Sequence, residues 1–231
     1  MTEKKTSLHH FFNNTWTVTI LSTMFGVYAG IYANDYFDHQ AMLNDKEKAF
    51  HDVVNEIEEN HNILSSYDSL LRHRFQGIKY VFSKVNDDNK IFMPKDTLDS
   101  FISRVDSVFK VEGIKDLGNR VHVTGELNLH IHSPLVARGL SRIIWDSYKQ
   151  TTYLTHTGFK CLTDMEVVYH LQDEVNRLND NWIDSFIAGT FYENAELRKE
   201  FISVWNQLLT RQEMLLTVYK KRHQFVENCS S

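Results

Sequence analysis

The feature that most constrains this chain is the segment from Thr6 to Asn34, which contains no Lys, Arg, Asp or Glu. Its main part, residues 11–34, is long enough to cross the hydrocarbon core of a bilayer as an α-helix, which takes about 20 residues. A cleaved signal peptide and a buried core helix are the two alternatives, and Ile31 and Ala33 stand at the offsets of a poor signal-peptidase site. We expect a retained transmembrane helix.

The residues that flank this segment predict its orientation. Lys4 and Lys5 precede it, whereas Asp35 and Asp38 follow it, and positively charged flanks stay on the cytoplasmic side of a membrane. We therefore expect a single-pass protein of the inner (cytoplasmic) membrane, with a cytoplasmic N-terminus and a periplasmic or otherwise extracytoplasmic C-terminal part. The expected division is a short cytoplasmic tail (residues 1–10), a transmembrane anchor (residues 11–34) and an extracytoplasmic domain (residues 35–231).

Small side chains recur every four residues within the expected anchor, at Ser22, Gly26 and Gly30. Small residues on one helical face allow the backbones of two membrane helices to approach closely. The pattern predicts self-association of the anchor through this face. A face that meets no partner is an equally good interpretation.

Composition limits the partners and the compartment. A net charge of −5 and a pI of about 6.2 disfavour nucleic acid as a partner, because nucleic acid binds basic surfaces. Only two prolines and nine glycines occur, which favours long helices in one ordinary domain behind the anchor. The two cysteines, Cys161 and Cys229, lack metal-site spacing. In an oxidising compartment they can form a disulfide, and two free thiols are the alternative.

The rest of the chain is expected to be mainly α-helical, because apolar residues recur at steps of three and four. The pattern predicts helices over residues 44–85, 94–109, 133–148, 163–186 and 197–219. Residues 121–131 instead alternate apolar and polar side chains as in a strand, with a hairpin turn at residues 117–119 or 125–126. We expect the anchor to be followed by an antiparallel bundle of four or five helices, with a small β-hairpin insertion near residues 111–132.

Three histidines, His122, His130 and His132, share the polar face of the expected strand and are candidate ligands of a surface metal ion. A solvated strand face that carries histidines without a metal is the simpler interpretation, since no HExxH or CxxC spacing supports a metal site. Glu58 and His61 form one Glu-x-x-His, whereas di-iron bundles use two. We expect no cofactor.

The sequence lacks the motifs of common catalytic sites. It contains neither a Gly-x-Ser-x-Gly elbow nor a phosphate-binding glycine loop, and Trp145, Trp182 and Trp205 stand at helical core spacing. These observations predict a membrane-tethered, non-enzymatic interaction or accessory protein whose helical domain binds a protein partner or self-associates. The alternative function is an extracytoplasmic bundle that senses a small ligand or a metal ion through the histidine-bearing hairpin.

Four short stretches carry a resemblance to a known group of proteins: Gly30 to Tyr36, Glu56 to Asn60, Ile144 to Ser147 and Val167 to Gln172. In these stretches and in the order of its features, the chain resembles uncharacterised single-pass membrane-anchored proteins of Bacteroidota and some Proteobacteria, which have no established activity. The resemblance implies an anchored helical domain outside the cytoplasm and implies no catalytic residues. The acidic residues Asp35 to Asp38 depart from the group, whose members usually carry a basic run after the membrane span.

Overall fold

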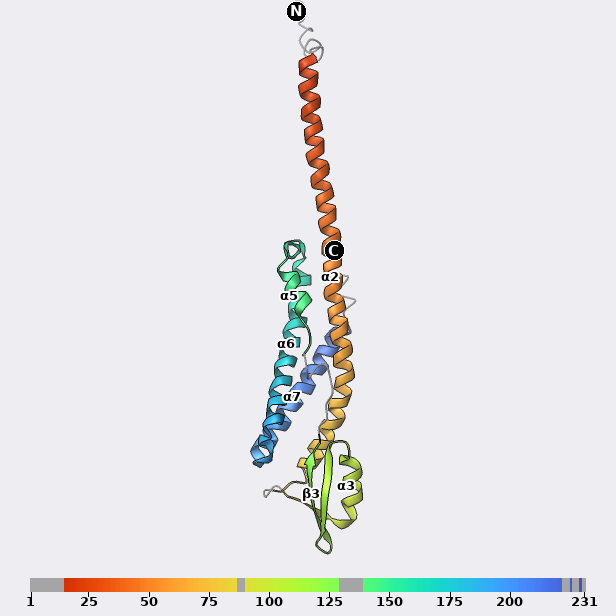
Figure 1. Ribbon diagram of the computed structural model, residues 1–231, viewed down its shortest axis with the longest axis vertical. Coiled ribbons are helices and arrows are strands. Elements are labelled where there is room, and N and C mark those ends of the chain that lie inside the picture. Colours follow the sequence, from red (N-terminus) through yellow and green to blue (C-terminus); the bar gives the residue numbers. More distant parts are fainter. Residues whose placement is uncertain (1–14, 87–89, 129–138, 222–224, 226–228, 230–231) are drawn as a thin grey trace, which may run out of the picture. The chain divides into compact units, whose positions relative to one another are not determined.

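The computed structural model describes residues 15–86, 90–128, 139–221, 225 and 229. These residues form helices α2 (Thr15–Phe82), α3 (Leu98–Val105), α5 (Ile143–Lys149), α6 (Phe159–Ala188) and α7 (Ala195–Tyr219), the 3-10 helices η1 (Lys95–Thr97), η2 (Thr152–His156) and η3 (Thr190–Tyr192), and strands β1 (Ile91–Pro94), β2 (Phe109–Asp116) and β3 (Arg120–Leu127). The expectation of a mainly helical chain with a small antiparallel β element is therefore confirmed (Figure 1). The chain divides into two compact units, Met1–His51 and Asp52–Ser231.

The first unit contains the N-terminal part of α2. By length and composition this part of α2 is suited to cross a membrane, since its most apolar window has a mean hydropathy of 1.2 and no buried residue. Two of the hydroxyl groups that lower its hydropathy are bonded within the helix: Thr19 Oγ1 donates to Thr15 O at 2.8 Å, and Thr23 Oγ1 donates to Thr19 O at 2.8 Å. Such internal bonds reduce the cost of placing a hydroxyl in hydrocarbon.

Helix α2 continues without interruption into the second unit, whereas the sequence predicted a separate helix from about residue 44. Residues at seven-residue steps, Ile57, Leu64, Leu71 and Ile78, are each 0% exposed. Seven-residue spacing keeps one apolar face turned toward neighbouring helices. These neighbours are α6 and α7, as ring contacts between α2 and α7 and hydrogen bonds between α2 and α6 show.

Helices α6 and α7 form an antiparallel hairpin (Figure 1). The residues at the end of α6 and at the start of α7 account for the turn between them. Gly189 ends α6 in the left-handed region at φ 65°, which glycine adopts without strain. Asn194 then begins α7, and its side-chain oxygen accepts a hydrogen bond from Leu197 N at 3.0 Å. Between the helices, Trp182 and Trp205 place their ring centroids 4.9 Å apart in the core. The predicted break between the helices expected over residues 163–186 and 197–219 is confirmed.

The sheet has the antiparallel order β1-β3-β2. Of the two predicted turn positions, the structure has the hairpin at residues 117–119, where Leu117 N donates to Arg120 O at 2.9 Å and Gly118 has a φ of 91°. Gly77 allows the start of β2 to approach α2, because an added Cβ would lie 2.7 Å from Val108 Cγ2. Gly77 thus serves close packing and does not interrupt the helix.

Two predicted helix boundaries are wrong. The expected helix over residues 94–109 ends at Val105, and Phe109 instead begins β2, with its ring edge-on to that of Phe101 at a centroid distance of 6.1 Å. The helix expected from residue 163 begins four residues earlier, at Phe159, so Thr163 lies inside α6, where its Oγ1 donates to Phe159 O. The expected helix start near residue 133 lies outside the described residues, and α5 begins only at residue 143.

Candidate functional site

A buried carboxylate, Glu56 of α2, holds the first turn of α5. Glu56 is 3% exposed, and both of its oxygens accept hydrogen bonds. Oε1 accepts from Ser141 Oγ at 2.7 Å and from Ile144 N at 3.0 Å. Oε2 accepts from Trp145 N at 3.2 Å and from Tyr169 OH at 2.8 Å. Backbone N–H groups at the start of a helix have no partner within the helix and carry partial positive charge, so the carboxylate acts as a cap supplied by another helix.

Two amide side chains fix the backbone that leads into α5. Asn60 of α2 accepts from Ser141 N at 2.9 Å and donates to Ser141 O at 2.7 Å. Asn176 of α6 does the same for the preceding residue, accepting from Leu140 N at 2.8 Å and donating to Leu140 O at 3.1 Å. Both polar groups of two consecutive backbone units are thus satisfied by side chains, which allows a non-helical segment to lie against the bundle.

The same cluster extends to α7 through Gln172, which is 0% exposed. Gln172 Nε2 donates to Ser141 O at 2.6 Å, and Tyr219 OH of α7 donates to Gln172 Oε1 at 2.8 Å. Burial, followed by the nearby charge of Glu56, raises the pKa of both Tyr169 and Tyr219. The phenols therefore remain protonated donors at neutral pH.

An ion-pair group lies beside this cluster. Arg142 Nε donates to Asp146 Oδ2 at 2.9 Å, and Arg142 Nη1 donates to Asp173 Oδ2. These hydrogen bonds raise the pKa of Arg142, and the hydrogen bond from Arg142 lowers the pKa of Asp146. The Arg142 ion pairs and the four hydrogen bonds of Glu56 together fasten α5 to α2 and α6. Each Glu56 oxygen already has two donors, so the arrangement offers no unoccupied acceptor position on Glu56 to act as a general base.

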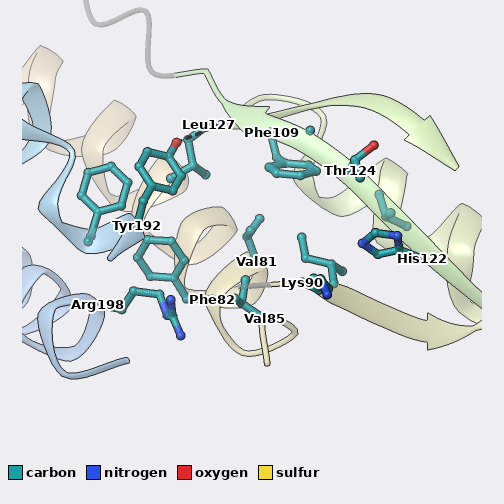
Figure 2. Close-up of a pocket in the computed structure, with 14 residues that line it drawn as sticks. Val81, Phe82, Val85, Lys90, Phe109, His122, Thr124, Leu127, Tyr192 and Arg198 are labelled. Carbon is teal, nitrogen blue, oxygen red and sulfur yellow. Dashed lines mark hydrogen bonds between the residues drawn. The ribbon is translucent and has the colours of Figure 1, made fainter. Parts of the chain in front are cut away.

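A separate pocket of about 430 Å³ lies in the second unit, at the junction of the sheet with α2, η3 and α7 (Figure 2). It is lined by Val81, Phe82, Val85, Lys90, Ile91, Phe109, His122, Val123, Thr124, Gly125, Leu127, Phe191, Tyr192 and Arg198. Its volume falls within the range of roughly 300–1,000 Å³ found for small-molecule sites.

The polar groups of this pocket are ordered by contacts in its wall. The Phe92 ring stacks on the His122 imidazole with centroids 4.8 Å apart. Tyr192 OH accepts a hydrogen bond from Leu127 N at 3.3 Å, and burial raises the pKa of Tyr192. Arg198, which is 7% exposed, donates from Nη2 to Asn86 O at 3.4 Å. The pocket thus combines an apolar wall with a few positioned polar groups.

Cys161 and Cys229 form a disulfide in the structure, with an S–S distance of 2.00 Å. The bond joins the first turn of α6 to Cys229, beyond the end of α7, across a sequence separation of 68 residues. Both cysteines are buried, at 0% and 5% exposed. The disulfide therefore closes the end of the hairpin opposite Gly189.

The candidate self-association residues Ser22, Gly26 and Gly30 all lie on α2 in the first unit. An added Cβ at Gly26 or Gly30 would meet no atom of the described chain within 4 Å, and Ser22 Oγ donates to Thr19 O at 3.0 Å. Within the described residues, no other part of this chain covers the two glycines.

Of the three candidate metal ligands, the structure describes only His122. His122 lies on β3 and lines the pocket, whereas His130 and His132 lie outside the described residues. Among the residues that the structure describes, no group of three or more His, Cys, Asp or Glu side chains is placed to hold a metal ion.

Sequence reasoning did not identify the buried cluster at Glu56. One signal was present, because Glu56 and Asn60 interrupt the apolar face that runs from Val53 to Leu64 on α2. A polar residue on such a face is either partnered or destabilising. The pattern could therefore have predicted buried polar contacts at these positions, although not the identity of their partners.

Comparisons of the chain with protein-family models, with curated proteins and with solved structures found no match. The resemblance described under Sequence analysis therefore stays a prediction.

Proposed function

We propose that this chain is a membrane-tethered, non-enzymatic interaction or accessory protein whose extracytoplasmic helical domain binds a protein partner or self-associates. The observation that carries the proposal is the continuity of α2. One helix, Thr15–Phe82, provides both the exposed apolar segment suited to a bilayer and the buried seven-residue pattern of the folded domain.

Two further observations support an extracytoplasmic location. The disulfide between Cys161 and Cys229 favours an oxidising compartment. The order of basic and acidic flanks favours a cytoplasmic N-terminus. Within the apolar segment, Thr19, Ser22 and Thr23 bond their hydroxyls to backbone oxygens of α2, which supports the membrane span itself. The proposal places the partner on the same side of the membrane as the domain, within the membrane, or both.

The uncovered face at Ser22, Gly26 and Gly30 supports self-association as one form of this function. Because a Cβ added at Gly26 meets no atom of the described residues within 4 Å, we expect a Gly26→Leu change to act on contacts with other molecules. Tyr28 lies on the other side of the helix and is 70% exposed. Tyr28→Leu is therefore a matched control in the same segment.

The test is crosslinking of the full-length protein in its own membrane, followed by solubilisation in mild detergent and identification of what is attached. We expect either a homo-oligomer or a specific partner that is also recovered in the reciprocal experiment. If the anchor self-associates, Gly26→Leu reduces the crosslinked homo-oligomer and Tyr28→Leu does not. Recovery of the monomer alone, in every crosslinking condition, contradicts the proposal.

A second candidate function, sensing of a small ligand outside the cytoplasm, is supported by the pocket at the sheet. The pocket has the size and the mixed lining of a small-molecule site. The expected histidine-bearing hairpin contributes His122 to it. Saturable binding of a small molecule to the full-length protein tests this candidate, and its absence across chemical classes contradicts it.

A further inference from the structure

The wall of the pocket is apolar over most of its residues. It is formed by Val81 and Phe82 at the end of α2, Val85 just beyond that end, Ile91, Phe109, Val123 and Leu127 of the sheet, and Phe191 of η3. Several of these side chains are themselves buried in the core, among them Val81, Val123 and Phe191. Such a wall favours a ligand with a hydrocarbon body, since apolar area removed from water is the main source of affinity in such sites.

The charge of the pocket is one-sided. Among the described residues that line it, Lys90, His122 and Arg198 can carry positive charge, and none is Asp or Glu. A cationic lining inside an apolar wall favours an anionic group, because charge-assisted hydrogen bonds are stronger where water is partly excluded. The same lining disfavours a cationic ligand.

Two of the basic residues come from neighbouring strands or their ends. Phe92 of β1 pairs with His122 of β3, and Lys90 immediately precedes β1 and lines the same pocket as His122. Stacking against Phe92 fixes the imidazole. Figure 2 shows His122 and Arg198 on opposite sides of the pocket, with Val81 and Val85 between them.

We propose that this pocket binds a small amphiphile with a hydrocarbon body and one carboxylate. The carboxylate lies at Lys90 and His122, where the exposed lysine keeps it near water, and the hydrocarbon lies over Val81, Val85 and Phe82. Arg198 on the far side adds positive charge without contacting the head group. The inference rests on the second candidate function, ligand sensing, and goes beyond the partner-binding proposal.

The test uses the full-length protein in lipid nanodiscs and measures equilibrium binding of radiolabelled octanoate, with empty nanodiscs as the blank. We expect saturable binding whose Kd falls roughly fourfold for each methylene added from hexanoate to decanoate, the factor that corresponds to burying a CH₂ group. Octylamine, which has the same chain and a positive head group, is expected to bind at least about tenfold more weakly.

Variants locate the head group. Lys90→Gln and His122→Gln change side chains at the edge of the pocket and leave the buried core intact, so we expect a folded protein and a Kd raised about two- to fivefold in each case. Lys84→Gln is the matched control, because Lys84 is an exposed lysine at the end of α2 that does not line the pocket. We expect it to leave the Kd unchanged.

The outcomes separate the two levels of the inference. Equal binding of octanoate and octylamine, or equal losses in Lys84→Gln and Lys90→Gln, overturns the anionic amphiphile and leaves ligand sensing standing with another ligand class. No saturable binding of any of these probes above empty nanodiscs overturns the inference, and it counts against ligand sensing as well.

Discussion

Replacing Glu56 by Gln is expected to weaken the attachment of α5 to the bundle. The change keeps the shape of the side chain and converts one acceptor oxygen into an amide that donates. Each Glu56 oxygen accepts two hydrogen bonds, from Ser141 and Ile144 or from Trp145 and Tyr169. Whichever oxygen is replaced, two donors lose their acceptor and face another donor.

The magnitude follows from the burial of these donors. A hydrogen bond to a charged group contributes about 1.5–3 kcal/mol, and leaving a buried donor unsatisfied costs about 1–3 kcal/mol. Since hydroxyl donors can rotate toward other acceptors and backbone donors cannot, we expect Glu56→Gln to lower the free energy of unfolding by about 3 kcal/mol. For a domain of this size that corresponds to a fall in Tm of roughly 6–12 °C.

The assay is thermal and urea unfolding of the full-length protein in mild detergent, followed by circular dichroism. Amide hydrogen exchange at Ile144 and Trp145 adds a local measurement. In Glu56→Gln, exchange at these two amides is expected to accelerate more than exchange elsewhere in the domain. Glu59→Gln is the matched control, because Glu59 lies on the same helix and is exposed. Equal stability of Glu56→Gln and Glu59→Gln, with unchanged exchange in α5, refutes the assignment of Glu56 as a buried cap.

Three further predictions follow from single contacts. Replacing Cys161 and Cys229 by Ser is expected to lower stability by about 4 kcal/mol, the chain-entropy value for a loop of this length; a reducing agent then lowers the Tm of the wild type and leaves that of the variant unchanged. Gly77→Ala is expected to destabilise by about 1–3 kcal/mol in urea unfolding, because the new Cβ meets Val108 and Val is too stiff to move aside; a gain of about 1 kcal/mol, the helix propensity of Ala over Gly, contradicts this. Burial raises the pKa of Tyr169, so the folded state keeps a proton that the unfolded state releases above about pH 10. The free energy of unfolding is therefore expected to be unaffected by Tyr169 below that pH and to fall above it. If the full tyrosinate absorbance appears before the protein unfolds, Tyr169 is not buried as described.

The long helices could be read from the sequence because their signal is repeated many times. Buried residues of α2 at seven-residue steps, such as Ile57, Leu64 and Leu71, form a pattern that no single substitution hides. The turn at Gly189 and the start of α7 were readable for a different reason, since a left-handed glycine and an Asn cap are local signals.

The sheet was only partly predictable because two of its strands carry weak patterns. β1 has four residues, too few to establish an alternation. β2 changes register between Val111 and Gly113, which shifts the side chains that follow to the other face and breaks the period of two. β3 has no such shift in its buried residues Val121 and Val123, and it was the strand that the sequence predicted.

The candidate sites were less predictable than the helices because their parts come together only in the fold. The hydrogen bonds of Glu56 join residues 85 to 113 positions apart. The pocket likewise combines His122 of the sheet with Arg198 of α7. The helix start expected at residue 163 was wrong for the opposite reason. Thr163 to Glu166 have the form of a capping box, a local motif that is also permitted inside a helix, and α6 begins four residues earlier.

The most direct test of the central proposal is protease accessibility of the C-terminal domain in sealed membrane vesicles of known orientation. The full-length protein carries a C-terminal epitope. One membrane sample is extracted with alkaline carbonate, and separate sealed vesicles, right-side-out and inside-out, are digested with protease. We predict that the protein stays in the carbonate-resistant membrane fraction at its full length, and that protease removes the epitope only from right-side-out vesicles. Release of the protein by carbonate, or loss of the epitope only from inside-out vesicles, contradicts a membrane-tethered domain outside the cytoplasm.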